Sequence, residues 1–415
     1  MGRIGKTFPL LLILIIAISS LILFDWIPLG LAQSGTNVTG IISQNTIWTQ
    51  ANSPYTLTGP VLISNGVVLT IQAGATVNLG SYYIDVNGTL QAIGSSLNPI
   101  TFNSAPNGQI NFTQYSSSWN QQTQTGSVIE NAVLTCSINI YHVSPLISNN
   151  QFTYSVNRFS DSSGIYVWGG SPIISNNTSN GVITVAGNGL AVISGNTIKG
   201  NYGGITCNIN NCDIIDNTLI GCEWAITVGG QAIGATIEGN LLYQSKVGIY
   251  FYNTPSGQAI IQNNTIANCT IGIQLPSPSS TITYNNFLND QLGISLIDTH
   301  ANILESNNIN ATYNYWGTTD QQTINQTIFD FKNNFNLGTV NFAPFLTALN
   351  SQTPTLPTST PTPTPTPTAT PISTSTPTVP ELSWLVIVPL LLSVFSVAVV
   401  LRHRKTSNLS KRTSR

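Results

Sequence analysis

The sequence predicts an all-β solenoid in which short strands of successive coils stack in parallel. Three observations support this prediction. The pattern Ile-x-x-Asn-x-Ile, or a close variant, recurs along the chain; its intervals run from 19 to 27 residues; and the residues between recurrences change freely. A steady period of this length is typical of solenoids. Short β-branched runs separated by Gly and Asn favour several strands per coil.

The repeated asparagine is taken as position zero of each coil. It falls at Asn131, Asn150, Asn177, Asn196, Asn217, Asn240, Asn264, Asn285 and Asn307. Positions −3, +2 and +9 are large and apolar in the five coils from 196 to 285, and the first coil offers Val128, Val133 and Ile140. We expect these positions to form inward columns. We also expect the asparagine to tolerate an αL turn and to donate its amide to the asparagine one coil away. Leucine-rich repeats have a similar period, but their Leu-x-x-Leu-x-Leu frame does not occur.

The composition limits the class of partner. Charged residues make up 6% of the chain, and residues 33–350 contain four Lys and Arg against twelve Asp and Glu. Nucleic-acid binding needs clustered cations that neutralise phosphates. The sequence therefore predicts no nucleic-acid partner.

The N-terminus carries the features of an export signal. Arg3 and Lys6 precede an apolar run over residues 8–24, and "LGLAQS" offers a small-residue cleavage site after Ala32. We interpret residues 1–32 as a signal peptide. An uncleaved membrane anchor is the alternative, because the apolar run is long for a signal peptide.

The C-terminus reads as a stalk and a membrane span. Residues 351–380 alternate Pro with Thr and Ser, which favours an extended polyproline II stalk suited to O-glycans. Residues 381–401 contain an apolar stretch long enough to span a bilayer, and "RHRK" follows it. The positive-inside rule then places residues 402–415 in the cytoplasm as a basic tail and the solenoid outside the cell.

Several quoted stretches resemble a known group. The strands "YGGITCN", "KVGIYFYN", "TIGIQLP" and "QLGISLI", with the turns "ISNN", "ISGN" and "IIDN", resemble repeats of right-handed parallel β-helices. These belong to the pectate-lyase-like superfamily and its NosD-like members. The resemblance implies N-terminal coils and a cap at 33–104, β-helix repeats at 105–310 and a closing segment at 311–350.

The same resemblance implies two kinds of catalysis. Polysaccharide lyases of the superfamily need Ca²⁺ held by Asp and a basic residue, and inverting glycosidases need paired carboxylates. This sequence lacks an Asp-Asp pair, Gly-His-Gly and Arg-x-Lys. Its best carboxylate group is Asp213, Asp216 and Glu238, for which solvated turn residues are the alternative. The NosD likeness also suggests copper, but residues 33–350 contain two His and no Met. We therefore expect no cofactor, apart from Ca²⁺ if the lyase alternative holds.

Aromatic residues are the better candidates for ligand binding. If Ile165 and Ile249 point inward, strand alternation turns four aromatic side chains outward: Tyr166, Trp168, Tyr250 and Tyr252. Such rings can stack on the apolar faces of sugars. Ordinary strand preference for aromatic residues is the alternative.

Cysteines and glycosylation sequons complete the candidate sites. Cys136, Cys222 and Cys269 share one repeat position and read as buried thiols, whereas Cys207 and Cys212 are close enough in sequence for a disulfide across a turn or for two free thiols. Nine Asn-x-Ser/Thr sequons are candidate glycosylation sites. They are Asn37, Asn87, Asn111, Asn176, Asn177, Asn263, Asn268, Asn310 and Asn325.

The sequence as a whole predicts a membrane-anchored cell-surface protein with a structural or adhesive envelope role, which includes binding of polysaccharide or envelope glycan. A carbohydrate-active enzyme, either a lyase or a glycosidase, is the alternative. The motif "VPELSW" before the apolar span resembles a sorting signal of archaeal surface proteins, with Leu in place of Phe. We therefore expect an archaeal source and a span that is clipped if the signal works.

Overall fold

The computed structural model describes residues 35–154, 164–200, 203–229, 234–252, 259–276, 280–297 and 308–357. The predicted signal peptide, membrane span and basic tail lie outside these residues, as does the stalk beyond residue 357. Within the described ranges, no helix is both long and apolar enough to cross a bilayer.

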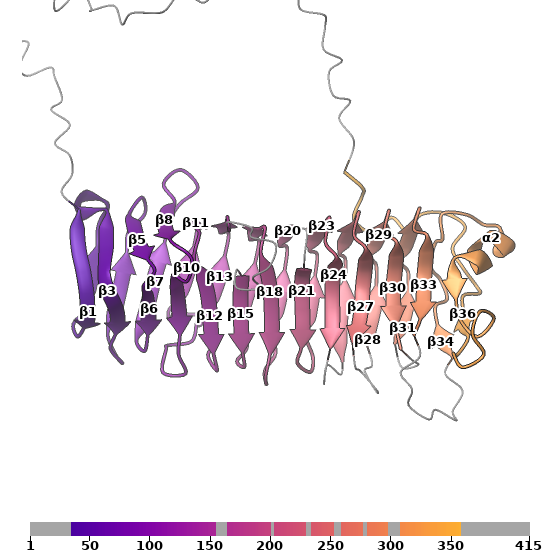
Figure 1. Ribbon diagram of the computed structural model, residues 1–415, viewed down its shortest axis with the longest axis horizontal. Coiled ribbons are helices and arrows are strands. Elements are labelled where there is room, and N and C mark those ends of the chain that lie inside the picture. The colour runs from indigo at the N-terminus through magenta and orange to yellow at the C-terminus, as the bar shows by residue number, and fades with distance from the viewer. Residues whose placement is uncertain are drawn as a thin grey trace, which may run out of the picture. The chain divides into compact units, whose positions relative to one another are not determined.

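Strands of successive coils stack side by side along one axis (Figure 1). One coil shows the plan: β22 (Asp213–Ile215), β23 (Thr218–Ile220) and β24 (Trp224–Gly229) follow one another, and β25 (Ala235–Glu238) begins the next coil above β22. The β22-type strands form a 13-stranded sheet, and the β23-type and β24-type strands share a 23-stranded sheet. All ladders between these strands are parallel, which confirms the predicted right-handed parallel β-helix.

The strands fall into three columns, named here by their place in the coil. The first column holds β2 (Thr46–Trp48), β4 (Val68–Ile71), β7 (Thr89–Ile93), β10 (Val128–Glu130), β13 (Leu146–Ser148), β16 (Ile173–Ser175), β19 (Val192–Ser194), β22, β25, β28 (Ala259–Gln262), β31 (Thr281–Thr283), β34 (Ile309–Asn310) and β36 (Val340–Asn341). The second holds β5 (Thr76–Gly80), β8 (Ile100–Ser104), β11 (Ala132–Leu134), β14 (Gln151–Phe152), β17 (Thr178–Ser179), β20 (Thr197–Lys199), β23, β26 (Leu241–Tyr243), β29 (Thr265–Ala267) and β32 (Asn286–Leu288). The third holds β6 (Tyr83–Val86), β9 (Gln109–Phe112), β12 (Ser137–Tyr141), β15 (Gly164–Trp168), β18 (Val182–Ala186), β21 (Gly203–Asn208), β24, β27 (Val247–Tyr252), β30 (Ile271–Leu275), β33 (Leu292–Leu296) and β35 (Ile328–Phe329).

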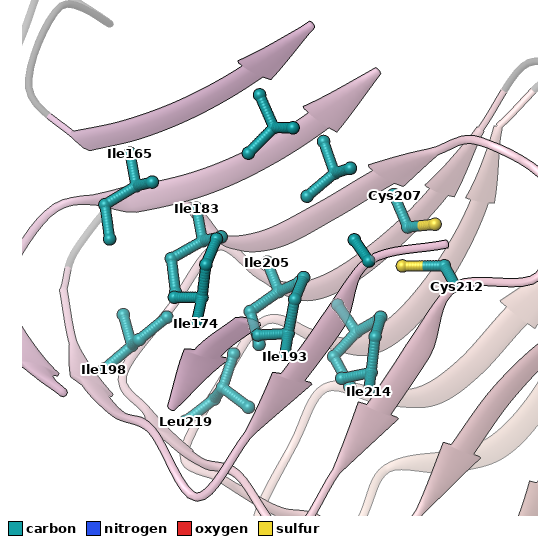
Figure 2. Packing of buried hydrophobic residues seen from close by; sticks show 14 of the residues in the cluster. Ile165, Ile174, Ile183, Ile193, Ile198, Ile205, Cys207, Cys212, Ile214 and Leu219 are labelled. Carbon is teal, nitrogen blue, oxygen red and sulfur yellow. The ribbon is translucent and has the colours of Figure 1, made fainter. Parts of the chain in front are cut away.

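The interior consists of columns of apolar side chains. In the first strand column, Ile174, Ile193 and Ile214 stack directly on one another (Figure 2). The residues at −3, +2 and +9 of the coils from 196 to 285 are all at most 3% exposed, which confirms the predicted inward columns. Full burial of such a side chain contributes about 1.5–3 kcal/mol, so these columns account for much of the stability of the stack.

For the coil of Asn131, the register predicted for the first two strands is wrong by one residue. Its columns run through Ile129 and Leu134, which pair with Ile147 and Phe152 of the next coil. Val128 and Ile140 are buried as predicted, but Val133 is not, and Ile138 rather than Ile140 continues the Ile165 column. A shift of one residue exchanges the two faces of a strand, so a single misplaced turn residue caused the error.

A ladder of buried asparagines runs along the corner between the first and second columns. Its members are Asn150, Asn177, Asn196, Asn217, Asn240, Asn264, Asn285 and Asn314. From Asn150 to Asn285, each asparagine donates its Nδ2 to Oδ1 of the next member at 2.9–3.1 Å. The backbone N–H of the same donating asparagine bonds to that Oδ1 as well, at 2.8–3.0 Å. The predicted amide ladder is confirmed for these members, and Asn307 lies outside the described residues.

The ladder corrects two details of the prediction. Asn131 is not a member, because the backbone N–H of Ala132 donates to Asn150 Oδ1 at 2.9 Å in its place. The αL conformation belongs to the residue before each ladder asparagine, such as Asp216 (φ 55°) and Asn263 (φ 55°). The ladder asparagine itself turns its amide inward, where it satisfies backbone groups that water cannot reach.

The two ends of the stack differ. At the N-terminal end, β1 (Thr36–Ile42) pairs with β3 (Tyr55–Ile63), and the 3₁₀ helix η1 (Gln50–Asn52) lies between β2 and β3. At the C-terminal end, the short helix α2 (Gln321–Gln326) begins at Asp320, whose carboxylate accepts from the N–H of Thr323 at 2.9 Å.

The chain then runs back over the second column. Asn350 N donates to Asn286 Oδ1 at 2.9 Å, and Thr265 Oγ1 donates to Thr353 Oγ1 at 2.9 Å. The predicted boundary at residue 350 is therefore too early, because the first residues assigned to the stalk pack on the solenoid.

Candidate functional site

Strand β27 places two tyrosines on the outer surface of the third column. Ile249 and Phe251 are 0% and 1% exposed and point inward, whereas Tyr252 is 53% exposed and Tyr250 is half-buried. The alternation predicted for this strand is confirmed. The rings of Tyr250 and Tyr252 lie 6.3 Å apart, centroid to centroid, on the face that the pleat turns to solvent.

A third ring extends this pair into a row. Trp224 of β24 stacks on Tyr250 with ring centroids 6.2 Å apart and an interplanar angle of 25°. Trp224 was not among the predicted residues, because strict alternation from Ile226 turns it inward. Ala225 and Ile226 are both buried, so the residue before them turns outward. The signal was present in the sequence, since Ala225 takes the place of the glycine in the repeated "GI".

A charged pair lies beside Trp224. Lys246 Nζ is 5.9 Å from the centroid of the Trp224 ring and forms an ion pair with Glu223 Oε1 at 2.8 Å. The Lys246 side chain is 61% exposed, so the ion pair contributes little to stability. The two charges balance each other at the edge of the ring row.

The other two predicted aromatic residues lie on β15. Ile165 and Val167 are 2% and 1% exposed, whereas Trp168 is 49% exposed. Trp168 pairs with Tyr141 of β12, which is itself 39% exposed. The outward placement of Tyr166 and Trp168 is confirmed, and Tyr141 joins them.

The predicted carboxylate group lies on a different face. Asp213 and Glu238 belong to first-column strands, and Asp216 occupies the αL turn after β22. Asp216 N donates to Glu238 O at 2.9 Å, so these two turns are neighbours, and Glu238 Oε1 accepts from Asn263 Nδ2 at 3.0 Å. The structure thus groups Asp216 with Glu238 but separates both from the third-column aromatic residues.

A fourth carboxylate lies inside the C-terminal coils. Asp290 Oδ1 accepts from the backbone N–H of Cys269 at 2.7 Å, and its Oδ2 is buried. Burial raises the pKa of Asp290 from 3.8 to about 8. The acid is therefore neutral under mildly acidic conditions, and its titration makes the stability of the fold depend on pH.

The five cysteines are all buried thiols. Burial raises the pKa of Cys136 and Cys269 to about 12 and that of Cys222 to about 11. The predicted disulfide between Cys207 and Cys212 is not formed: both are free thiols whose sulfur atoms face each other across the turn (Figure 2). A hydrogen bond between the two thiols lowers the pKa of Cys207 and raises that of Cys212.

One predicted glycosylation site is wrong. Asn177 is 1% exposed, and its Nδ2 donates to Ile147 O and to the next ladder member, so no glycan can be attached. The other eight sequons stay predictions. Asn37, Asn176, Asn268 and Asn310 are exposed, whereas Asn87, Asn111, Asn263 and Asn325 are half-buried.

The described residues do not fit a copper site. The two thiols of Cys207 and Cys212 form the nearest approach to soft ligands. In the described ranges, no three side chains of His, Cys, Asp or Glu come together as a ligand set. We derive no role for a metal from this arrangement.

Comparison with known proteins gives one family and one group of structures. Residues 173–344 match the family described as "Periplasmic copper-binding protein (NosD)". Two solved structures of the periplasmic alginate epimerase AlgG, one of a double mutant and one without a stated substitution, are 12% and 11% identical to the chain. Each match covers 70% of this chain and 75% of the epimerase chain, and the TM-scores are 0.40 and 0.36. No curated protein sequence matches the chain.

Proposed function

We propose that this protein is an exported envelope β-helix that binds glycans through the outer face of its third strand column. The observation that carries the proposal is the row of Trp224, Tyr250 and Tyr252, which presents aromatic rings on a rigid sheet. A sheet fixes the spacing of the rings, so little conformational entropy is lost when a ligand stacks on them.

The location is proposed on sequence grounds. The predicted signal peptide and membrane span place the solenoid outside the cytoplasm, and the partial match to a family described as periplasmic supports that placement. The membrane anchor, the extracellular side and the archaeal source stay predictions.

The chemistry of the row favours a sugar over a protein partner. Tyr250 is half-buried between Trp224 and Tyr252, so the exposed ring surface is a narrow ridge rather than a broad apolar patch. Protein interfaces need a larger apolar area. The facing residues Thr227 and Gln274 of the neighbouring coils add hydrogen-bonding groups beside the rings.

The test is retention of the purified protein on envelope polysaccharide. We expect the double variant Tyr250→Ala, Tyr252→Ala to bind roughly 30-fold more weakly, from about 1 kcal/mol for each stacked ring. Tyr284→Ala is the matched control, because Tyr284 is 45% exposed and stacks on Tyr313 at a first-column turn. Equal retention of wild type and double variant, or no retention of either, would contradict the proposal.

A further inference from the structure

Pairing in the third column aligns two outward rows over five coils. The first row runs Tyr166, Thr184, Thr206, Thr227 and Tyr250. The second runs Trp168, Ala186, Asn208, Gly229 and Tyr252, where the step from Asn208 to Gly229 continues the register of Cys207 with Val228. Each row thus begins and ends with an aromatic residue and has small residues between.

Two aromatic clusters stand at the ends of these rows. The first consists of Tyr141, Tyr166 and Trp168, and the second of Trp224, Tyr250 and Tyr252. Four coil steps separate β15 from β27, so at about 4.8 Å a step the matching rings lie about 19 Å apart. The surface between them carries hydroxyl, amide and methyl groups. The carboxamide of Asn208 lies over Gly229, since a Cβ added there would meet Asn208 Oδ1 at 2.4 Å.

The charge of this face narrows the class of ligand. None of the residues in the two rows is charged, and the nearest pair, Glu223 with Lys246, is joined at 2.8 Å. The cations among the described residues are Lys199, Lys246 and Lys332. Among the described residues of this face, a polyanion would find no set of cations, and a polycation would find no unpaired carboxylate. Threonine hydroxyls and an amide instead suit the hydroxyl groups of an uncharged sugar.

We propose that the two clusters bind one uncharged polysaccharide chain that runs along the solenoid axis. The chain contacts Trp168 in the first cluster and Tyr252 in the second. This inference rests on the proposed function and adds the direction, the length and the charge class of the ligand. Binding at the second cluster makes binding at the first intramolecular, so a chain that reaches both gains affinity beyond either site alone.

The experiment measures affinity of the full-length protein for neutral gluco-, manno- and galacto-oligosaccharides of graded length. We expect affinity to rise about tenfold or more once the oligosaccharide exceeds about 19 Å, because only then can it contact both clusters. Trp168→Ala should abolish that rise with length, while Trp168→Phe should retain part of it. Uronic-acid oligosaccharides of equal length should bind more weakly than neutral ones.

The outcomes separate the two proposals. Binding that depends on Tyr250 and Tyr252 but does not rise with length, or a Trp168→Ala variant with the wild-type length dependence, would overturn the two-cluster inference alone. Tighter binding of uronic-acid chains would overturn the charge class. Absence of binding to every oligosaccharide, with an unchanged melting temperature, would overturn the proposed function as well.

Discussion

The N-terminal coils and the coils from residue 150 onward use asparagine in opposite ways. In the N-terminal coils, asparagine side chains form hydrogen-bonded chains on the outer surface of the solenoid. Asn103 Nδ2 donates to Asn78 Oδ1 at 3.0 Å, and Asn111 Nδ2 donates to Asp85 Oδ1 at 2.8 Å. From Asn150 to Asn314, the amide ladder runs inside and satisfies buried backbone groups.

This difference explains why only part of the sequence shows a visible repeat. An outer amide competes with water and can be replaced by many polar residues at little cost. An inner amide must donate and accept in one geometry, and no other side chain of its size does both. The inner ladder therefore requires asparagine at one position in each coil, whereas the outer hydrogen-bonded chains require no particular residue and give no visible sequence repeat.

The largest expected effect concerns the inward columns that both regions share. Ile237→Asp should destabilise the solenoid by several kcal/mol, because an unpaired charge is buried and each coil depends on its neighbours. Outward Thr227→Asp should change the melting temperature little. Equal melting temperatures for these two variants would contradict the coil register.

The second prediction compares the loss of one asparagine from the inner ladder with the loss of one from an outer chain. Asn217→Ala should cost about 3 kcal/mol, since more than one buried group loses its partner at about 1–3 kcal/mol each. Asn111→Ala, which removes a half-exposed amide from an outer chain, should cost less than about 1 kcal/mol. Urea unfolding measures both. Similar losses would show that the inner and outer chains contribute alike.

The third prediction compares a buried with an outer carboxylate. The pKa of Asp290 is raised to about 8 in the fold, so between about pH 4 and 8 the folded state holds a proton that the unfolded state has lost. Stability should fall as pH rises through that window, with a slope of at most about 1.4 kcal/mol per pH unit, and level off above it. Asp290→Asn should remove the slope, whereas Asp85→Asn should retain it. A wild-type unfolding free energy that rises from pH 5 to 8 would contradict this account.

The smallest effect is expected at the first-column turns. Replacing Asp213 and Asp216 by Asn and Glu238 by Gln should change stability by no more than about 0.5 kcal/mol for each site, as is usual for surface substitutions. Retention on polysaccharide should also be unchanged, because these residues lie on another face from the aromatic row. If the wild-type protein cleaved a polysaccharide and the triple variant did not, the enzyme alternative would replace our proposal.

The inward columns could be predicted from the sequence wherever a ladder asparagine marks the register of the coil. The columns through Ile214, Leu219 and Ile226 follow from the position of Asn217, because the same turn precedes each set. The prediction failed at Asn131, since Ala132 takes the ladder position there and a backbone N–H leaves no mark in the sequence. The packing of Thr353 on Thr265 could not be predicted either, because it joins residues 88 apart.

The candidate site likewise contains residues that the sequence predicts and one that it does not. Tyr250 and Tyr252 were predictable from alternation within one strand. Trp224 could not be found from alternation alone, because two consecutive buried residues interrupt the alternation of β24, and only the match of Ala225 to the glycine of "GI" indicates its outward place. The distance between the aromatic clusters depends on how many coils lie between β15 and β27, which alternation within a strand does not report.

One paired measurement tests the central claim that the inner repeats carry stability and the outer face carries binding. Melting temperature and polysaccharide retention are measured together for Asn217→Ala and for the double variant Tyr250→Ala, Tyr252→Ala. We predict that the ladder variant melts at a lower temperature yet binds normally while folded, and that the tyrosine variant melts as wild type and loses retention. Loss of both properties in both variants, or retention without the tyrosines, would contradict the account.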